Sequence, residues 1–99
     1  MKILSISNFE LREIDSEYQG NFICTPANLS DFQFNALCWI SEAIAWDGAN
    51  IIWSNNKAWW DDQNGRRYSV FMTVEGSAML EDWGRDEKEY KLFRIFFNR

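Results

Sequence analysis

The chain of 99 residues has no histidine, a single proline and only two cysteines. Without histidine, the commonest general base, nucleophile partner and zinc ligand is missing, which removes whole classes of enzyme reaction. Cys24 and Cys38 are too few to staple a small secreted domain, so we expect two reduced, buried thiols. No apolar run reaches the roughly eighteen residues that a membrane-spanning helix needs, so no membrane span is expected.

The N-terminus also lacks the apolar stretch of a signal peptide. After Lys2, the segment Ile3-Leu4-Ser5-Ile6-Ser7-Asn8 turns polar within a few residues, which favours a cytoplasmic protein. What the chain does contain is 46% hydrophobic and 17% aromatic residues, including six tryptophans. This content is enough for a real core, and we predict one domain over residues 1–99.

The charge of the chain is unevenly distributed. The formal net charge is −5; residues 1–49 hold two basic and seven acidic side chains, whereas residues 50–99 hold eight of each. An acidic surface repels phosphate backbones and attracts basic surfaces. Direct nucleic acid binding is therefore disfavoured, and a larger nucleic-acid-handling protein with a basic surface is a better partner. Modest acidity also serves simply to keep a small domain soluble.

The clearest local signal is a helix from about Asp31 to Trp46. Ser30 is a good N-cap with Gln33 three residues on, and Gly48 suits the left-handed backbone near a helix C-terminus. Helical periodicity predicts an apolar face of Phe32, Ala36, Ile40, Ala43 and Ile44, opposite Asp31, Asn35, Ser41 and Glu42. Phe34 and Cys38 fall on the polar side, so the helix is either covered on two sides or displays an aromatic ring to a partner.

Extended segments precede and follow this helix. Before it, residues 3–6 and Phe9 to Ile14 alternate as strands, and a turn leads to a return strand at residues 22–25, which predicts an N-terminal hairpin. After it, strands are predicted at residues 50–54, 58–62, 68–74, 78–83 and 88–97, with a helix at 78–83 as the less favoured interpretation. Asn64-Gly65 predicts a type I′ turn, and the last strand is apolar on both faces and should be interior. The predicted fold class is α+β, with one amphipathic helix packed on an antiparallel sheet of about five to seven strands.

The densest cluster of unusual residues runs from Trp59 to Tyr68. Adjacent side chains on a strand point to opposite faces, so one of Trp59 and Trp60 should be exposed. Rings beside Arg66 and Arg67 are typical of an RNA or single-strand binding module, and rings beside polar groups can also hold a glycan. The neighbouring Asp61 and Asp62 argue against nucleic acid, and cross-strand Asp–Arg pairs with packed rings explain the same residues structurally.

Protein recognition explains the remaining aromatic and acidic residues best, because exposed aromatic side chains are enriched in interface hot spots. The candidate partner-binding residues are Glu10, Glu13, Asp15, Glu17, Phe34, Trp39, Glu42, Trp46, Trp59, Trp60, Asp61 and Asp62. The first four acids are a candidate rim, although they are also typical of a solvated hairpin face.

Enzyme chemistry finds little support in the sequence. The carboxylate neighbours Asp61/Asp62 and Glu81/Asp82 should diverge on their strands, and no imidazole is available to activate a hydroxyl or thiol. Phosphate loops, metal motifs and nucleotide fingerprints are absent, so neither a cofactor nor a metal is expected, and we predict that the protein is not an enzyme.

In size, acidity and lack of catalytic residues, the chain resembles small inhibitors of bacterial defence carried by phages and mobile elements, anti-CRISPR proteins among them. It also resembles immunity proteins that neutralise toxins. The resemblance is one of overall profile and implies a protein-binding inhibitor that blocks a basic, nucleic-acid-binding surface of a larger target. The alternatives are the RNA, single-strand or glycan binding module on the Trp59–Tyr68 hairpin, and a homo-oligomeric domain held by exposed aromatic rings.

Overall fold

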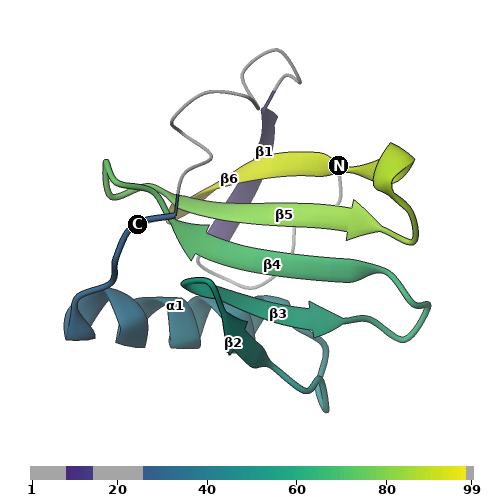
Figure 1. Ribbon diagram of the computed structural model, residues 1–99, viewed down its shortest axis with the longest axis horizontal. Helices are drawn as coiled ribbons and strands as arrows, with labels where there is room; N and C mark the ends of the chain where they lie inside the picture. Colours follow the sequence, from purple (N-terminus) through teal and green to yellow (C-terminus); the bar gives the residue numbers. More distant parts are fainter. Residues whose placement is uncertain (1–8, 15–25, 98–99) are drawn as a thin grey trace.

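The computed structural model describes residues 9–14 and 26–97, which form one helix and a six-stranded antiparallel sheet (Figure 1). The strand order in the sheet is β1-β6-β5-β4-β3-β2. The elements are β1 (Phe9–Ile14), α1 (Asp31–Ile44), β2 (Ile52–Ser54), β3 (Lys57–Asp61), β4 (Arg67–Met72), β5 (Ala78–Gly84), the 3-10 helix η3 (Glu87–Glu89) and β6 (Lys91–Phe97). The predicted α+β class and the antiparallel sheet are confirmed.

Helix α1 packs against one face of the sheet, mainly over β4 and β3. In Figure 1, β1 crosses behind β5 and β6, so the sheet curls toward its helix side. The contact between the Phe9 ring of β1 and the Trp39 ring of α1, with centroids 5.1 Å apart, closes this curl. The core beneath the helix consists of Phe9, Leu11, Leu37, Ile40, Ala58, Trp60, Val70, Met72, Ala78, Leu80 and Ile95.

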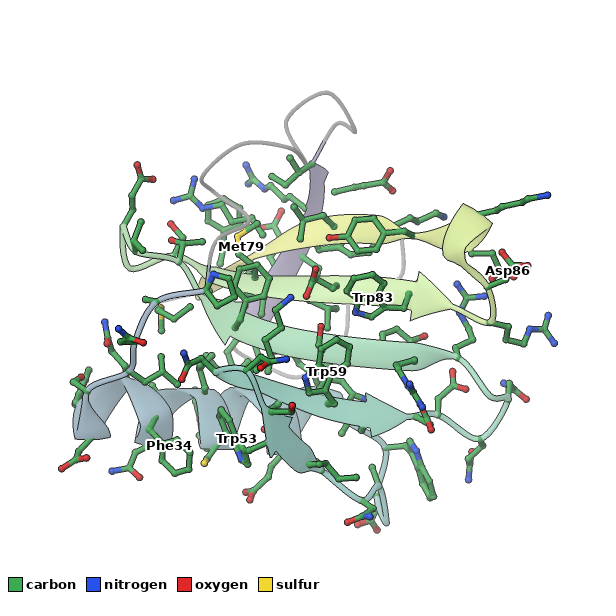
Figure 2. The ribbon with its side chains drawn as sticks, viewed as in Figure 1. Phe34, Trp53, Trp59, Met79, Trp83 and Asp86 are labelled. Carbon is green, nitrogen blue, oxygen red and sulfur yellow. The ribbon has the colours of Figure 1, made fainter. Side chains whose placement is uncertain are left out.

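The opposite face of the sheet is also apolar along its central strands. Phe71, Met79 and Leu92 are buried there as a second cluster. Figure 2 shows Trp59, Met79 and Trp83 in front of the strands on this face. Strands β4, β5 and β6 are therefore buried on both sides, and β6 lies between β1 and β5, which confirms the predicted interior position of the last strand.

The predicted start of the helix is confirmed, but its end and its buried face differ from the prediction. Ser30 and Gln33 form a reciprocal capping box, and the helix ends at Ile44, before Trp46. Gly48 has the expected positive φ of 99° but lies in the following turn, because Ala45 is already extended.

The buried residues of α1 are Leu37, Ile40 and Ser41. Of the predicted apolar face, Ile40 is buried and Ala43 and Ile44 pack against the core, as expected. Phe32, predicted to face the core, is 82% exposed, and Ser41, predicted to be polar surface, is buried and donates a hydrogen bond to the Cys38 carbonyl at 3.0 Å. The helix is rotated relative to the predicted face because Phe34 packs against Trp53 of β2, with ring centroids 4.5 Å apart. Periodicity alone cannot reveal such a contact.

The predicted type I′ turn at Asn64-Gly65 is wrong. The two consecutive residues with positive φ that such a turn requires are Asn55 (54°) and Asn56 (62°), between β2 and β3. In the β3–β4 turn only Gly65 is left-handed, and the Asp62 carboxylate accepts hydrogen bonds from the backbone N–H groups of Asn64 and Arg66. This side chain stabilises a longer, three-residue loop in place of the two-residue turn.

Several other predictions have plain outcomes. Residues 78–83 are extended in β5, as preferred over a helix. The segments 3–6 and 22–25, the N-terminal hairpin that they were predicted to form, and Cys24 lie outside the described residues. Cys38 is a free thiol and is partly exposed, so the prediction that it is buried is wrong. Its partial burial, and then the charge of Glu42, raise the pKa of the thiol. Among the described helices, none is long and apolar enough to cross a membrane.

Candidate functional site

The candidate site lies at the end of β3, where the sheet edge loses its outer strand. Strand β2 pairs with β3 only between Lys57 and Trp59, so Asp61 extends past its neighbour. Trp46, in the loop after α1, donates its indole N–H to the carbonyl oxygen of Asp61 at 2.8 Å. This bond fixes a 37% exposed tryptophan across the edge of the sheet.

Trp46, Trp60 and Asp62 form a wall shared by two hollows. The first, which we call the edge hollow, has a volume of about 600 Å³ and opens at the rim of the sheet. Its apolar side includes Ile52, which is exposed. The lining residues are Trp46, Gly48, Asn50, Ile52, Ser54, Trp59, Trp60, Asp61, Asp62 and Arg67.

The second hollow, which we call the acidic hollow, measures about 530 Å³ and lies on the helix side of the sheet, beside the C-terminal end of α1. The rings of Trp60 and Tyr68 stack in its wall, with centroids 5.8 Å apart and planes 20° apart. Three carboxylates and one ammonium group surround these rings. The lining residues are Leu11, Glu13, Ile44, Trp46, Trp60, Asp62, Tyr68, Leu80, Asp82, Lys91 and Phe93.

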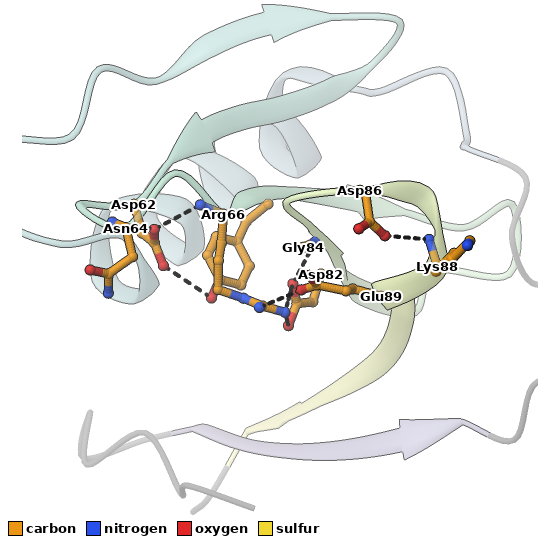
Figure 3. A network of polar contacts seen from close by, with 9 residues as sticks. Asp62, Asn64, Arg66, Asp82, Gly84, Asp86, Lys88 and Glu89 are labelled. Atoms are coloured by element: carbon orange, nitrogen blue, oxygen red, sulfur yellow. Dashed lines mark hydrogen bonds and ion pairs between the residues drawn. The ribbon is translucent and has the colours of Figure 1, made fainter.

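An arginine holds the corner behind the acidic hollow (Figure 3). Arg66 donates to both oxygens of Asp82 at 3.1 Å and to Glu89 Oε2 at 2.6 Å. The hydrogen bonds to Asp82, then the charge of Asp82 and the hydrogen bond to Glu89, raise the pKa of Arg66, so the guanidinium stays charged. Gly84, which also donates to Asp82, has a φ of 62° in a space where any Cβ would collide with the Glu89 side chain.

Two further contacts set the electrostatics near the hollows. Arg67 donates to both oxygens of Asp61 at 2.9 and 3.4 Å, which lowers the pKa of Asp61 and confirms the predicted cross-strand Asp–Arg pair. The Tyr68 hydroxyl donates to Asp62 Oδ2 at 3.4 Å. Burial, and secondarily the negative charge of Asp82, raises the pKa of Tyr68.

The structure brings together half of the residues predicted to bind a partner. Five of them line the edge hollow. Three of these five, Trp46, Trp60 and Asp62, also line the acidic hollow, where Glu13 of β1 is a sixth predicted residue. Those five are Trp46, Trp59, Trp60, Asp61 and Asp62.

The other predicted residues lie elsewhere. Three of them are exposed on α1: Phe34, Trp39 and Glu42. The Trp39 ring contacts the Phe9 ring of β1. Glu10 pairs with Arg12 at 3.0 Å and is three residues from Glu13, so the two acids face opposite sides of β1 and do not form one rim. Asp15 and Glu17 lie outside the described residues.

Sequence reasoning missed a buried polar network on the face opposite the helix. Glu81 is 3% exposed and accepts hydrogen bonds from Lys57 Nζ (2.7 Å), Ser69 Oγ (2.7 Å) and the Tyr90 hydroxyl (2.8 Å). The indole of Trp83 donates to Ser69 Oγ at 3.0 Å. Strand alternation places Lys57, Ser69 and Glu81 on one face, which is the signal that could have revealed the network.

The two neighbouring tryptophans and the neighbours Glu81 and Asp82 follow the predicted alternation, whereas Asp61 and Asp62 both line the edge hollow. Trp60 is 4% exposed in the helix-side core, whereas Trp59 is partly accessible on the other face, where it stacks on Trp83 with centroids 5.7 Å apart. Glu81 and Asp82 also diverge, one into the buried network and the other into the acidic hollow.

Within residues 9–14 and 26–97, no group of three or more Cys, Asp or Glu side chains is arranged to hold a metal ion. The chain matches no protein-family model, and the comparisons with curated proteins and with solved structures likewise find no significant match. The function therefore has to be argued from the hollows and their chemistry.

Proposed function

We propose that the chain is a small acidic inhibitor that binds a larger protein and covers a basic, nucleic-acid-handling surface of that protein. The observation that supports this most directly is the wall of Trp46, Trp60 and Asp62 between two open hollows. It combines the accessible ring of Trp46 with the Asp62 carboxylate at the edge of the sheet. Anti-CRISPR proteins and toxin-neutralising immunity proteins are the classes whose profile the chain resembles.

The hollows suit protruding side chains of a protein partner. Aromatic residues in concave, partly desolvated positions provide most of the binding energy of protein interfaces. Carboxylates around them accelerate encounter with a basic surface and disfavour acidic partners. The net charge of −5 acts in the same direction.

The carboxylates of the acidic hollow are better suited to binding than to catalysis. Asp82 is occupied on both oxygens by Arg66, and Asp62 Oδ1 is committed to the backbone of the β3–β4 turn. A general acid or base has to exchange protons freely with a substrate, which these hydrogen bonds oppose. Both groups instead present fixed negative charge.

The experiment that tests the proposal is a capture comparison followed by a functional assay. Immobilised wild-type protein and the variants Trp46→Ala and Glu75→Gln are exposed to host lysate, and bound proteins are quantified by mass spectrometry. We expect a nucleic-acid-handling protein that wild type and Glu75→Gln retain equally and that Trp46→Ala loses at least tenfold. The purified partner should then lose its affinity for an oligonucleotide when one equivalent of wild type is added.

The proposal fails if no retained protein depends on Trp46, or if the partner binds its oligonucleotide unchanged in the presence of the inhibitor. Glu75 is the matched control because it is exposed in the β4–β5 turn and lines neither hollow.

A second candidate function is an RNA, single-strand or glycan binding module, and one observation favours it. A further hollow of about 460 Å³ places the stacked Trp59 and Trp83 beside Arg67 and Arg85. Stacked rings with arginines can hold a base and its phosphate. Asp61 and Asp86 line the same hollow and offset its positive charge. A salt-sensitive quench of tryptophan fluorescence by a single-stranded oligonucleotide, lost in Arg85→Gln, would rank this function first.

A further inference from the structure

We infer that the acidic hollow receives one arginine side chain of the partner protein, with the guanidinium paired with Asp62 and lying against the accessible parts of Trp46 and Tyr68, while Glu13 from β1 adds negative charge to the same hollow. This inference rests on the proposed function and specifies the chemistry by which that function would recognise its partner.

The charge balance of the hollow calls for a cation. Of its three carboxylates, Asp82 is paired with Arg66, which also pairs with Glu89. Glu13 is exposed and forms no ion pair with any described residue. From the described residues, Asp62 Oδ2 accepts one long hydrogen bond, from the Tyr68 hydroxyl at 3.4 Å. Two carboxylates thus keep free acceptor capacity, against the single ammonium group of Lys91, which is exposed on β6.

The rings of the hollow favour a planar cation over a spherical one. Trp46, Trp60, Tyr68 and Phe93 supply the aromatic part of the lining. A guanidinium can lie flat on a ring while its N–H groups pair with a carboxylate, whereas an ammonium is more strongly hydrated and loses more on leaving water. Arginine therefore gains from both parts of the lining at once.

The same corner of the molecule already holds one guanidinium of its own. Arg66 is partly exposed and lies between Asp82 and Glu89, as Figure 3 shows. One terminal nitrogen of Arg66 donates to both Asp82 oxygens and the other donates to Glu89, so two carboxylates already hold a guanidinium at this corner. Asp62 and Glu13 line the same hollow as Asp82 and have no ion-pair partner among the described residues.

The test uses the isolated protein and a defined arginine probe. Nitrogen-15 spectra of the six indole N–H groups are recorded during titration with N-acetyl-arginine methylamide and with its neutral isostere, N-acetyl-citrulline methylamide. The Trp60 and Trp46 signals are assigned with Trp60→Phe and Trp46→Phe. We expect a saturable shift of these two signals with the arginine probe and at least tenfold weaker binding of the citrulline probe.

Matched variants separate the hollow from general charge effects. Asp62→Asn should weaken binding of the arginine probe at least threefold and Glu13→Gln by a smaller factor, while Glu75→Gln and Asp31→Asn, which change the net charge equally, leave it unchanged. Asparagine at position 62 retains an oxygen that can accept from the turn backbone. Equal shifts with arginine and citrulline, a tighter N-acetyl-lysine methylamide complex, or insensitivity to Glu13→Gln and Asp62→Asn would each overturn the inference.

Failure of this inference and failure of the proposed function give different results. If the Trp46-dependent partner is captured but no arginine binding is seen at the hollow, the inference is wrong and the inhibitor function stands. If the arginine probe binds as expected but no captured protein depends on Trp46, the hollow is a guanidinium site and the proposed inhibitor function is wrong.

Discussion

At the scale of single residues, Glu81 has the most demanding environment in the described structure. A carboxylate withdrawn from water is stable only if donors replace its hydration, and Lys57, Ser69 and Tyr90 do so. Lys57 is itself nearly buried, 4.8 Å from the centre of the Phe71 ring. Each charge therefore depends on the other.

We predict that Glu81→Gln lowers the free energy of unfolding by about 3 kcal/mol, because it leaves the Lys57 ammonium buried without its counter-charge. Urea denaturation followed by circular dichroism measures the loss. The double variant Lys57→Met/Glu81→Gln should recover at least half of it, since no unpaired charge then remains. A double variant as unstable as the single one would show that the charge pair is not the cause.

Tyr68 gives a prediction on pH. Its pKa is raised in the folded protein by burial and by Asp82, so folding favours the neutral phenol. The stability linked to this shift is complete below the unfolded pKa of about 10 and is lost as pH rises through the higher folded value. Absorbance at 295 nm should show one tyrosine titrating later than in urea, and Tyr68→Phe should remove that late component. A late component that persists in Tyr68→Phe would assign it to another tyrosine.

The sequence predicts individual side chains where the relevant neighbour is close in the chain. The pair of Asp61 with Arg67 follows from a single hairpin, and the opposite faces of Trp59 and Trp60 follow from strand alternation. Asp82 and Asp62 line the same hollow because β5 and β3 both pair with β4, on its two sides. That register is a property of the whole fold, so the hollow could not be read from the sequence.

At the scale of elements, local signals set where the helix starts, and tertiary contacts set which face it buries. The Ser30–Gln33 capping box is complete within four residues of chain, so it can be recognised from the sequence. The rotation of α1 depends on Trp53, nineteen residues after Phe34, and was therefore predicted wrongly.

We predict that Ser30→Ala lowers the free energy of unfolding by about 1 kcal/mol, because the Gln33 backbone N–H loses its acceptor. Thermal denaturation measures the effect. Asn35→Ala, at an exposed position in the same helix, should leave stability equal or slightly higher, since alanine is the better helix former. Equal losses in both variants would contradict a capping role.

Two turn glycines provide a matched pair. Gly65 and Gly84 both have positive φ, but a Cβ at Gly65 meets open space, whereas one at Gly84 collides with Glu89. Gly65→Ala should cost about 1 kcal/mol from backbone strain alone. Gly84→Ala should lower the free energy of unfolding distinctly more. It should also displace the Glu89 side chain and so weaken the ion pair between Arg66 and Glu89. Parallel urea denaturation of the two variants compares them, and equal losses would rule out the collision.

At the scale of the whole molecule, the acidic groups and the open rings should act on different steps of association. The net charge of −5 acts at long range and is screened by salt, whereas ring burial acts after contact. Sequence arithmetic predicted the charge, but only the folded chain shows that Glu13 from β1 and Asp62 from the β3–β4 turn meet at one hollow.

For the partner captured through Trp46, we predict that the association rate constant falls about tenfold when salt is raised from low to high ionic strength, with little change in dissociation. Trp46→Ala should show the reverse, with faster dissociation and a nearly unchanged association rate. Surface plasmon resonance at several salt concentrations resolves both constants. A salt-independent association rate would contradict electrostatic steering.

The indole of Trp46 also has a consequence for solubility. Where a sheet ends in free backbone groups, another copy of the chain can add its own strand, and stacks of such copies grow into fibres. On β3, the carbonyl of Asp61 that would receive the incoming strand is already taken by a side chain of the same molecule. The tryptophan that we propose as a partner contact thereby also removes one of the acceptors that a strand from another copy would need at this edge.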